Sequence, residues 1–163
     1  NFTAAQYNAK PAYLRDGVIL NWSHEIDLAL HLLGTAYVEA SSTRIVDGHD
    51  DMADILLTHE SGCRSTIHLD YLTEPERRYF IIQGSEGRIT CVLPERNLFL
   101  HTDCADRLGD WFHGKGSYDT DYVDEMKAFL DRIDGKDVPG CTGAEALEVL
   151  KICLEVRKQA GLT

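Results

Sequence analysis

The sequence predicts an α+β domain built on a single open, largely antiparallel (mixed) β-sheet, with helices packed on one of its faces. Three observations carry this prediction. Short β-prone segments follow one another between residues 37 and 101, and turns separate them. A segment with helical periodicity precedes these strands, and two more follow them. A run of strands flanked by amphipathic helices is typical of an α+β domain.

The composition indicates one domain with a sizeable core, since 44% of the 163 residues are hydrophobic. Lys and Arg number 16 against 27 Asp and Glu, so the net charge is −11, which disfavours nucleic acid or an anionic membrane as partner. No apolar run has the length of a membrane span, and no signal-peptide pattern is present, so we expect a soluble, cytoplasmic protein. The five widely spaced cysteines are expected to be buried free thiols.

The first elements are expected where an extended apolar run, residues 17–20, ends at a polar turn and feeds a helix over residues 23–33. Ser23 is a plausible N-cap, and Gly34 stands where a left-handed residue often ends a helix. The spacing of the apolar residues predicts a buried stripe formed by Ile26, Leu30 and Leu33.

A second face of this helix carries His24, Asp27 and His31. Asn21 and His24 fall where the chain turns into the helix, and a helix N-terminus offers free N–H groups and a partial positive charge. This corner therefore suits a bound polar ligand.

The middle of the chain is expected to form a meander of strands. Residues 63–71 alternate regularly, which is typical of a half-buried antiparallel strand. The turn at residues 84–87 has the pattern Gly-x-x-Gly, but it joins two strands. A dinucleotide-binding loop needs three glycines that open a helix after a strand, so we interpret this turn as a hairpin.

The C-terminal part is expected to hold an irregular connection and two helices. Residues 102–118 form the connection, and the helix after it has a predicted apolar stripe of Val123, Met126, Leu130 and Ile133. The pattern Thr142-Gly143-Ala144-Glu145 is a capping box, which predicts the start of the last helix.

The stretch from Asp16 to Gly34 resembles the opening of the C-terminal domain in the glucose-fructose oxidoreductase, inositol dehydrogenase and related (Gfo/Idh/MocA) family. Family members often show two glycines, apolar residues, an acid and a His-Glu-Ile-Asp sequence before a helix. Here Asp16 replaces the first glycine and Asn21 replaces the acid, whereas His24 to Asp27 match. The resemblance extends over residues 6–163, because the hairpin turn and the capping box also have counterparts in the family.

The resemblance implies a two-domain NAD(P)-dependent oxidoreductase, with a Rossmann domain that is absent from this chain. Residues 1–163 would be the C-terminal domain for substrate binding and oligomerisation. The implied reaction is hydride transfer at a hydroxyl-bearing carbon of a sugar, cyclitol or related polyol. NAD or NADP would be held mainly by the missing domain, so no cofactor is expected in this chain, which alone would be inactive.

The resemblance also implies roles for five residues. His24 is the candidate catalytic base, since its neutral imidazole can accept a hydroxyl proton. Asn21 can orient substrate or His24 through hydrogen bonds, but an amide does no acid or base work. Asp27 could bind substrate or hold the His24 tautomer. Tyr7 and Lys10 would contact substrate, although a solvated surface position is the more usual one for a lysine such as Lys10.

Two alternatives remain open from the sequence. The first is a metal site made by His24, Asp27 and His31 together with the acidic turn at residues 49–51. The spacing of these histidines does not match the H-E-x-x-H motif, which makes this alternative the weaker one.

The second alternative is an assembly module that needs no catalytic site. The outer faces of strands 63–71 and 78–83 mix polar and apolar residues, as a homodimer interface does. This alternative is compatible with the oxidoreductase hypothesis, and it would make the protein a homo-oligomer.

Overall fold

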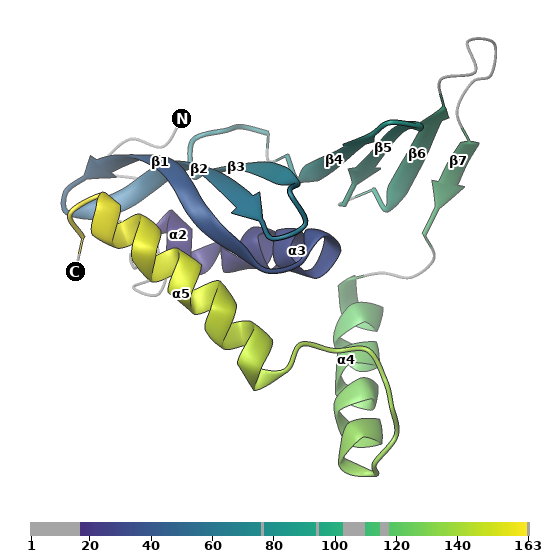
Figure 1. Ribbon diagram of the computed structural model, residues 1–163. Coiled ribbons are helices and arrows are strands. Elements are labelled where there is room, and N and C mark those ends of the chain that lie inside the picture. Colours follow the sequence, from purple (N-terminus) through teal and green to yellow (C-terminus); the bar gives the residue numbers. More distant parts are fainter. Residues whose placement is uncertain (1–16, 76, 94, 103–109, 115–117, 163) are drawn as a thin grey trace. The chain divides into compact units, whose positions relative to one another are not determined.

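The computed structural model describes residues 17–75, 77–93, 95–102, 110–114 and 118–162 (Figure 1). The chain divides into two compact units, one made of the residues up to Thr73 and from Cys141 onward, the other of residues 74–140. The predicted α+β class is confirmed, and every described strand pairing is antiparallel. The strands form two hydrogen-bonded sheets, where the sequence predicted one.

The first sheet contains β1 (Ala36–Val46), β2 (His49–His59) and β3 (Arg64–Asp70) in that order. Strict alternation along β2 buries one face, because its odd-numbered residues from Asp51 to His59 are buried and its even-numbered ones are not. The pairing of Ile55 with Ile67 keeps the apolar residues of β2 and β3 on the same side.

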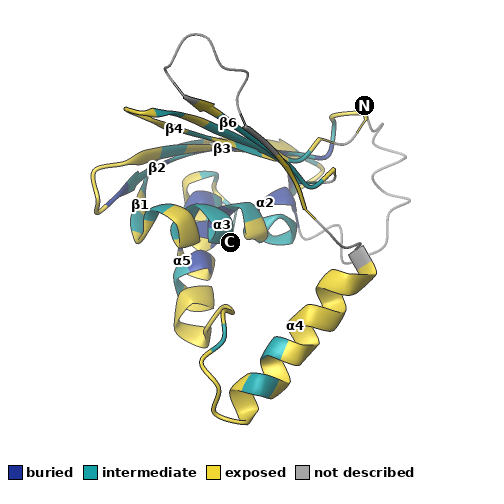
Figure 2. Ribbon diagram, turned by 90° about the vertical axis from the view of Figure 1, so that its right-hand side faces the viewer, coloured by how far each residue is buried: buried dark blue, intermediate teal, exposed yellow. Residues whose placement is uncertain are grey.

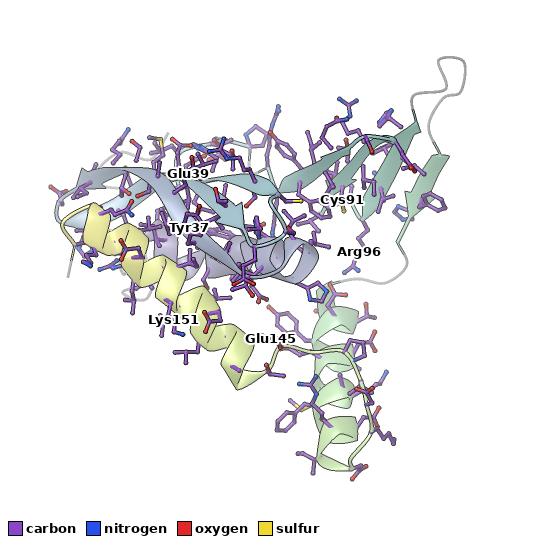
Figure 3. The ribbon with its side chains drawn as sticks, in the orientation of Figure 1. Tyr37, Glu39, Cys91, Arg96, Glu145 and Lys151 are labelled. Carbon is purple, nitrogen blue, oxygen red and sulfur yellow. The ribbon has the colours of Figure 1, made fainter. Side chains whose placement is uncertain are left out.

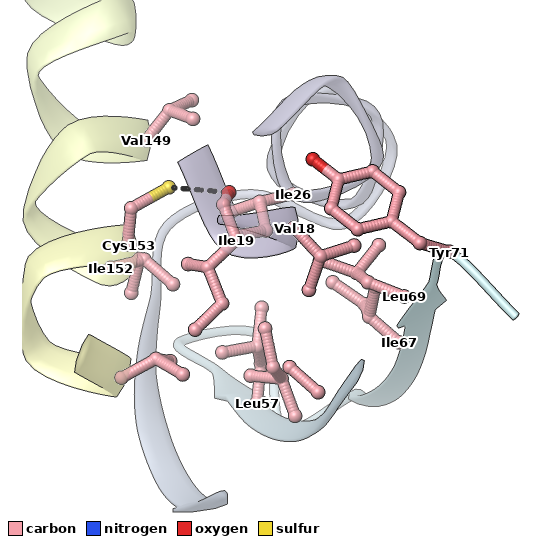
Figure 4. Packing of buried hydrophobic residues seen from close by; sticks show 13 residues of the cluster. Val18, Ile19, Ile26, Leu57, Ile67, Leu69, Tyr71, Val149, Ile152 and Cys153 are labelled. Atoms are coloured by element: carbon pink, nitrogen blue, oxygen red, sulfur yellow. Dashed lines mark hydrogen bonds between the residues drawn. The ribbon is translucent and has the colours of Figure 1, made fainter. Parts of the chain in front are cut away.

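Three helices pack on this buried face: α2 (Val18–Asn21), α3 (Ser23–Leu33) and α5 (Gly143–Gln159). For α3 and α5 this confirms the predicted packing of helices on one face of the sheet. Figure 4 shows their common core. It consists of Val18, Ile19, Ile26, Ala53, Ile55, Leu57, Ile67, Leu69, Tyr71, Val149, Ile152, Cys153 and Val156. Each large aliphatic side chain buried here contributes about 1.5–3 kcal/mol to folding. Of the predicted α3 stripe, Ile26 is buried, whereas Leu30 and Leu33 are half-buried.

The predicted extended run at residues 17–20 is wrong, because this segment forms the short helix α2. Short apolar runs fit a strand and a buried helical turn equally well. Here the helical turn is selected by contacts far away in the sequence: the Asp50 carboxylate accepts the Ile19 N–H at 2.8 Å. The Ser23 cap is also absent, since Trp22 occupies the N-cap position of α3 and no side-chain cap is formed.

Asp50 lies at the centre of this arrangement, fully buried on β2. Its Oδ2 binds α2, and its Oδ1 accepts a charge-assisted hydrogen bond from Arg157 of α5 at 2.9 Å. The backbone of Gly17 passes so close that an added Cβ would lie 2.1 Å from the Asp50 Oδ1. Gly17 also has a φ of +100°, so only glycine fits this position without strain.

The last helix begins as predicted. Thr142 accepts the Glu145 N–H through its side chain at 3.2 Å, and the Glu145 carboxylate accepts the Thr142 N–H at 2.7 Å, which completes the capping box. Figure 3 labels Glu145 in the first turn of α5. No helix in the described part of the chain is long and apolar enough to cross a bilayer.

The first sheet ends where Asp70 turns the chain. Its carboxylate accepts the backbone N–H groups of Leu72 and Thr73, each at 2.5 Å, and the Thr73 hydroxyl at 2.8 Å. Pro75, shortly after, has no N–H to donate to a ladder. β3 therefore ends before this segment, and the strands that follow belong to the second sheet.

The second unit is a meander of β4 (Tyr79–Gly84), β5 (Gly87–Val92), β6 (Asn97–Thr102) and β7 (Asp110–His113), followed by α4 (Tyr118–Ile133). Gly84 pairs with Gly87, which confirms that the Gly-x-x-Gly turn is a hairpin. Arg96, labelled in Figure 3, forms an ion pair with Asp121 of α4.

The predicted apolar stripe of α4 is exposed, as the yellow colour of this helix in Figure 2 shows. Its four residues Val123, Met126, Leu130 and Ile133 are all more than half exposed, with values between 51% and 67%. None of residues 74–75, 77–93, 95–101, 112–114 and 119–140 is buried. An amphipathic pattern indicates which face of a helix favours burial, but not whether the chain itself covers that face.

We predict that Asp50→Asn lowers the free energy of unfolding by about 3 kcal/mol, because it breaks the ion pair between the fully buried Asp50 carboxylate and the largely buried Arg157. Urea-induced unfolding measures this loss. The matched control is Asp54→Asn on the same strand, whose carboxylate is half exposed and pairs with His68, so its effect should stay within about 0.5 kcal/mol. Equal losses in the two variants would show that the Asp50 contacts do not hold the unit together.

The outer face of the first sheet gives a pH-dependent prediction. His68 lies between Asp54 at 2.7 Å and Asp70 at 3.0 Å, and its hydrogen bond to Asp54, followed by that to Asp70, raises the pKa of its imidazole. A raised pKa in the folded state means that these contacts stabilise the fold below pH of about 6.5 and that this contribution is lost as the pH rises.

His68→Gln should therefore destabilise the protein more at pH 5.5 than at pH 8, as urea unfolding at both values would measure. The effect is modest, because the His68 side chain is 52% exposed. His31→Gln, at an exposed position on α3, controls for the removal of a histidine. A difference between His68→Gln and wild type that does not change with pH would contradict the prediction.

Candidate functional site

The turn between α2 and α3 positions Asn21 and His24. Trp22 joins the two helices with φ −108° and ψ 29°, and its carbonyl accepts the Glu25 N–H at 3.2 Å. His24 lies in the first turn of α3, where it is exposed. The Trp22 ring meets its imidazole edge to face, with ring centroids 5.8 Å apart, and this contact restricts the orientation of the imidazole.

Asn21 is held by Tyr71, the residue that follows β3. The Asn21 Nδ2 donates to the Tyr71 hydroxyl at 2.6 Å, and this hydroxyl donates to the Gly17 carbonyl at 3.2 Å. Tyr71 is buried and belongs to the core of the unit. The Asn21 amide is therefore anchored to the interior rather than free in solvent.

A hollow of about 300 Å³ lies between this corner and α5. Its polar lining comes from Ser23, His24, Asp27 and Cys141. Its apolar lining is contributed by Leu20, Ala146, Val149, Leu150 and Cys153. An apolar surface with a few polar groups at its edge is the usual composition of a small-molecule site.

Asp27 faces a thiol across this hollow. Its Oδ1 lies 3.9 Å from the Cys141 Sγ, so the described contact of Asp27 is with Cys141 rather than with the His24 imidazole. Loss of solvent around Cys141, followed by the charges of Asp27 and Glu145, raises the pKa of the Cys141 thiol.

The second thiol of the hollow is protonated for a simpler reason. Burial raises the pKa of Cys153 to about 11, and its Sγ donates to the Ile19 carbonyl at 3.7 Å, the dashed line in Figure 4. Since the thiolate is the nucleophile and the metal ligand, neither cysteine of this hollow is suited to nucleophilic or metal chemistry at neutral pH. His24 and Asp27 remain as its groups for proton transfer and hydrogen bonding.

The structure thus brings His24 and Asp27 to one hollow, while Asn21 sits on the neighbouring turn and binds Tyr71. Tyr7 and Lys10 lie outside the described residues, so their substrate contacts stay predictions. Sequence reasoning missed Tyr71. Its signal was present, because it is the last residue on the buried face of an alternating strand and carries a hydroxyl that needs a partner when buried.

The residues of the alternative metal site do not converge. Among the described residues, no three His, Cys, Asp or Glu side chains could hold an ion together. Asp50 is paired with Arg157, and Asp51 with Arg44 at 2.9 Å, which leaves these carboxylates engaged elsewhere. The segment between β7 and α4 contains two glycines, Gly114 and Gly116, and not the three that a dinucleotide-binding loop requires.

Comparison with solved structures shows the same fold in several dehydrogenases. UDP-N-acetylglucosamine 3-dehydrogenase GnnA from Acidithiobacillus ferrooxidans matches with a TM-score of 0.81 and 21% identity, over 94% of this chain and 51% of that one. Levoglucosan dehydrogenase in complex with NADH matches with a TM-score of 0.84 and 16% identity, over 97% of this chain and 53% of that one.

A third structure, the WlbA dehydrogenase from Bordetella pertussis in complex with NADH and UDP-GlcNAcA, has a TM-score of 0.65 and 17% identity, over 98% of this chain and 50% of that one. At such identities the likeness concerns the fold. The chain spans about half the length of these proteins. A comparison with curated protein sequences gives no significant match.

The family model of the GFO/IDH/MocA C-terminal domain matches residues 3–90, which is more than half of the 163-residue chain. This match covers the α2–α3 corner, the whole first sheet and the hairpin of the second. The chain therefore belongs to the GFO/IDH/MocA family, as a C-terminal domain.

Proposed function

We propose that the chain is the substrate-binding domain of an NAD(P)-dependent oxidoreductase that acts on a hydroxyl of a sugar, cyclitol or related polyol. Family membership supports the reaction class, and two of the matched structures are complexes with NADH. The chain spans about half the length of these structures, which supports a separate dinucleotide-binding domain in the full-length protein. The names of the matched proteins, which include sugar-nucleotide and anhydrosugar dehydrogenases, support the substrate class.

The observation that carries this proposal is the pairing of an exposed imidazole with an apolar hollow of about 300 Å³. Oxidation of an alcohol removes a proton from the hydroxyl as the hydride leaves the carbon, so a base must lie beside that hydroxyl. In this role His24 takes the proton on a ring nitrogen. The restricted orientation of the imidazole beside Trp22 reduces the entropy lost when substrate binds.

The other residues of the corner act on substrate through hydrogen bonds. Asp27 accepts from sugar hydroxyls at the edge of the hollow, and the Asn21 amide contacts them from the turn. Tyr7 and Lys10 complete the substrate contacts. The nicotinamide, bound by the other domain, supplies the hydride acceptor, and the chain described here supplies substrate binding and the base. This chain alone is therefore expected to catalyse no turnover.

The test is a cofactor-reduction assay of the full-length protein with a panel of sugars, cyclitols and sugar acids. His24→Ala should lower kcat at least about 100-fold, as expected for the loss of a general base. The control is His31→Ala, which removes an exposed histidine near the other end of the same helix and should leave kcat within about twofold. Unchanged turnover in His24→Ala would remove His24 from the mechanism, and intact cofactor binding would exclude misfolding.

A homodimer formed through a sheet face is a second candidate function, compatible with the first. The observation that favours it is the exposure of Tyr79 (57%) and Ile81 (52%), which share one face of β4. Large apolar side chains side by side on an exposed sheet face are typical of an interface.

Analytical ultracentrifugation tests this second candidate. Wild type should sediment as a dimer at micromolar concentration, and Ile81→Arg should shift it toward the monomer, because an arginine placed in the apolar contact cannot be desolvated cheaply. Ser85→Arg, in the exposed β4–β5 turn, adds the same charge outside the face and should leave the dimer intact. A monomer at all concentrations in wild type would exclude the assembly role.

A further inference from the structure

Within the described part of the chain, the Tyr71 hydroxyl makes two hydrogen bonds in which it plays opposite roles. The Gly17 carbonyl, at 3.2 Å, can only accept, so the hydroxyl gives its single proton to that carbonyl. Its oxygen can then only accept from the side chain of residue 21, which lies at 2.6 Å. This geometry requires a donor at position 21, and the N–H of the Asn21 amide provides it.

The Gly17 carbonyl cannot turn away from Tyr71, because the segment around it is fixed on several sides. It also accepts the backbone N–H of Asn21 at 3.2 Å. Two residues further on, the Ile19 N–H is bound by the buried Asp50, and Asp50 is itself paired with Arg157. The direction of the hydrogen bond between Tyr71 and residue 21 is therefore set by the fold.

A carboxylate at position 21 could not donate a hydrogen bond to the Tyr71 hydroxyl, since its oxygens only accept. It would face the lone pairs of the Tyr71 hydroxyl, or it would draw the hydroxyl proton away from Gly17. An amide avoids both, and it leaves the Asn21 Oδ1 available. Within the described part of the chain, no group donates a hydrogen bond to that Oδ1.

We infer that Tyr71 is a positioning residue that selects an amide at position 21 and directs its Oδ1 toward substrate as a hydrogen-bond acceptor. Asn21 then binds a substrate hydroxyl that does not react, and His24 is the proton acceptor of the corner. The part of this inference that concerns substrate rests on the proposed function, whereas the match between Tyr71 and Asn21 does not.

The first experiment uses the thermal unfolding of Asn21→Asp. At pH 7 we expect a melting temperature about 2–4 °C below wild type, the shift produced by the loss of roughly one hydrogen bond in a chain of this size. The control is Asn97→Asp, the same chemical change where the Asn97 Oδ1 lies 3.0 Å from the His113 Nδ1 and acts as an acceptor. This control should leave the melting temperature within about 1 °C or raise it.

The pH dependence of the melting temperature distinguishes the loss of a hydrogen-bond donor at position 21 from a general loss of packing. A protonated carboxyl at position 21 has an O–H that can donate to Tyr71, so the pKa of the carboxyl introduced by Asn21→Asp should be raised. The difference from wild type should therefore shrink as the pH falls from about 7 to about 4.5. The titratable groups on the elements around α2 include Asp50 of β2, Cys153 and Arg157 of α5, His24, Glu25 and Asp27 of α3, and Tyr71 after β3. Tyr71 apart, they surround the introduced carboxylate in the Tyr71→Phe background as well, so that background is the reference for their effect.

Tyr71→Phe removes the hydroxyl that accepts from residue 21, and together with Asn21→Asp it completes a double-mutant cycle. In this background Asn21→Asp should no longer lower the melting temperature in a pH-dependent way, because no hydroxyl remains to be mismatched. The inference is overturned if Asn21→Asp is as stable as wild type at pH 7, which would mean that Tyr71 donates to residue 21. An equal, pH-independent loss in both backgrounds would also overturn it.

Steady-state kinetics of the full-length protein test the substrate part. Tyr71→Phe should raise KM about 3- to 10-fold and leave kcat within about twofold, because an oriented acceptor for a non-reacting hydroxyl contributes binding equally in the ground and transition states. A fall in kcat with unchanged KM would contradict this role. If wild type oxidises no polyol, the proposed function fails, and the unfolding experiments still decide whether Tyr71 selects the amide.

Discussion

The buried carboxylate of Asp50 is the contact on which the first unit depends. One of its oxygens binds the Ile19 N–H of α2, and the other binds Arg157 of α5, so a single side chain on β2 joins both helices to the sheet. An unpaired carboxylate at this depth would be strongly destabilising, whereas this one is neutralised by the arginine and satisfied by hydrogen bonds. The short helix α2 exists because of it, since a four-residue segment has no helical stability of its own.

The corner that carries Asn21 and His24 depends indirectly on the contacts of Asp50. Gly17 must lack a side chain to pass Asp50, and its carbonyl then meets Tyr71, which in turn holds Asn21. Each of these contacts restricts the position of the next residue in the series. His24, one turn further, is exposed but starts from a fixed backbone. A general base that acts on a substrate arriving from solvent needs a rigid backbone beneath it and an exposed side chain.

Much of the fold could be predicted from the sequence where the signal was local. The alternation in β3, the Gly84–Gly87 hairpin and the capping box at Thr142 all specify their structure within a few residues. The α2 helix and the turn after β3 are bound by the carboxylates of Asp50 and Asp70, which act on backbone groups that periodicity does not reveal. The corner itself was predicted from His24 and Asn21. Its partner Tyr71 lies 50 residues away, and the alternation of the strand before it indicates that Tyr71 is buried but not that it binds Asn21.

The second unit, residues 74–140, is inserted between β3 and α5 of the first. The contacts that close the first core consequently join residues far apart in the chain: 107 positions separate Asp50 from Arg157, and 134 separate Ile19 from Cys153. During synthesis on the ribosome, the helices and strands that precede α5 must wait until the whole insertion has been translated before this core can close. Until then the apolar surface that α5 covers in the complete fold remains exposed to solvent, and such exposed surface favours aggregation.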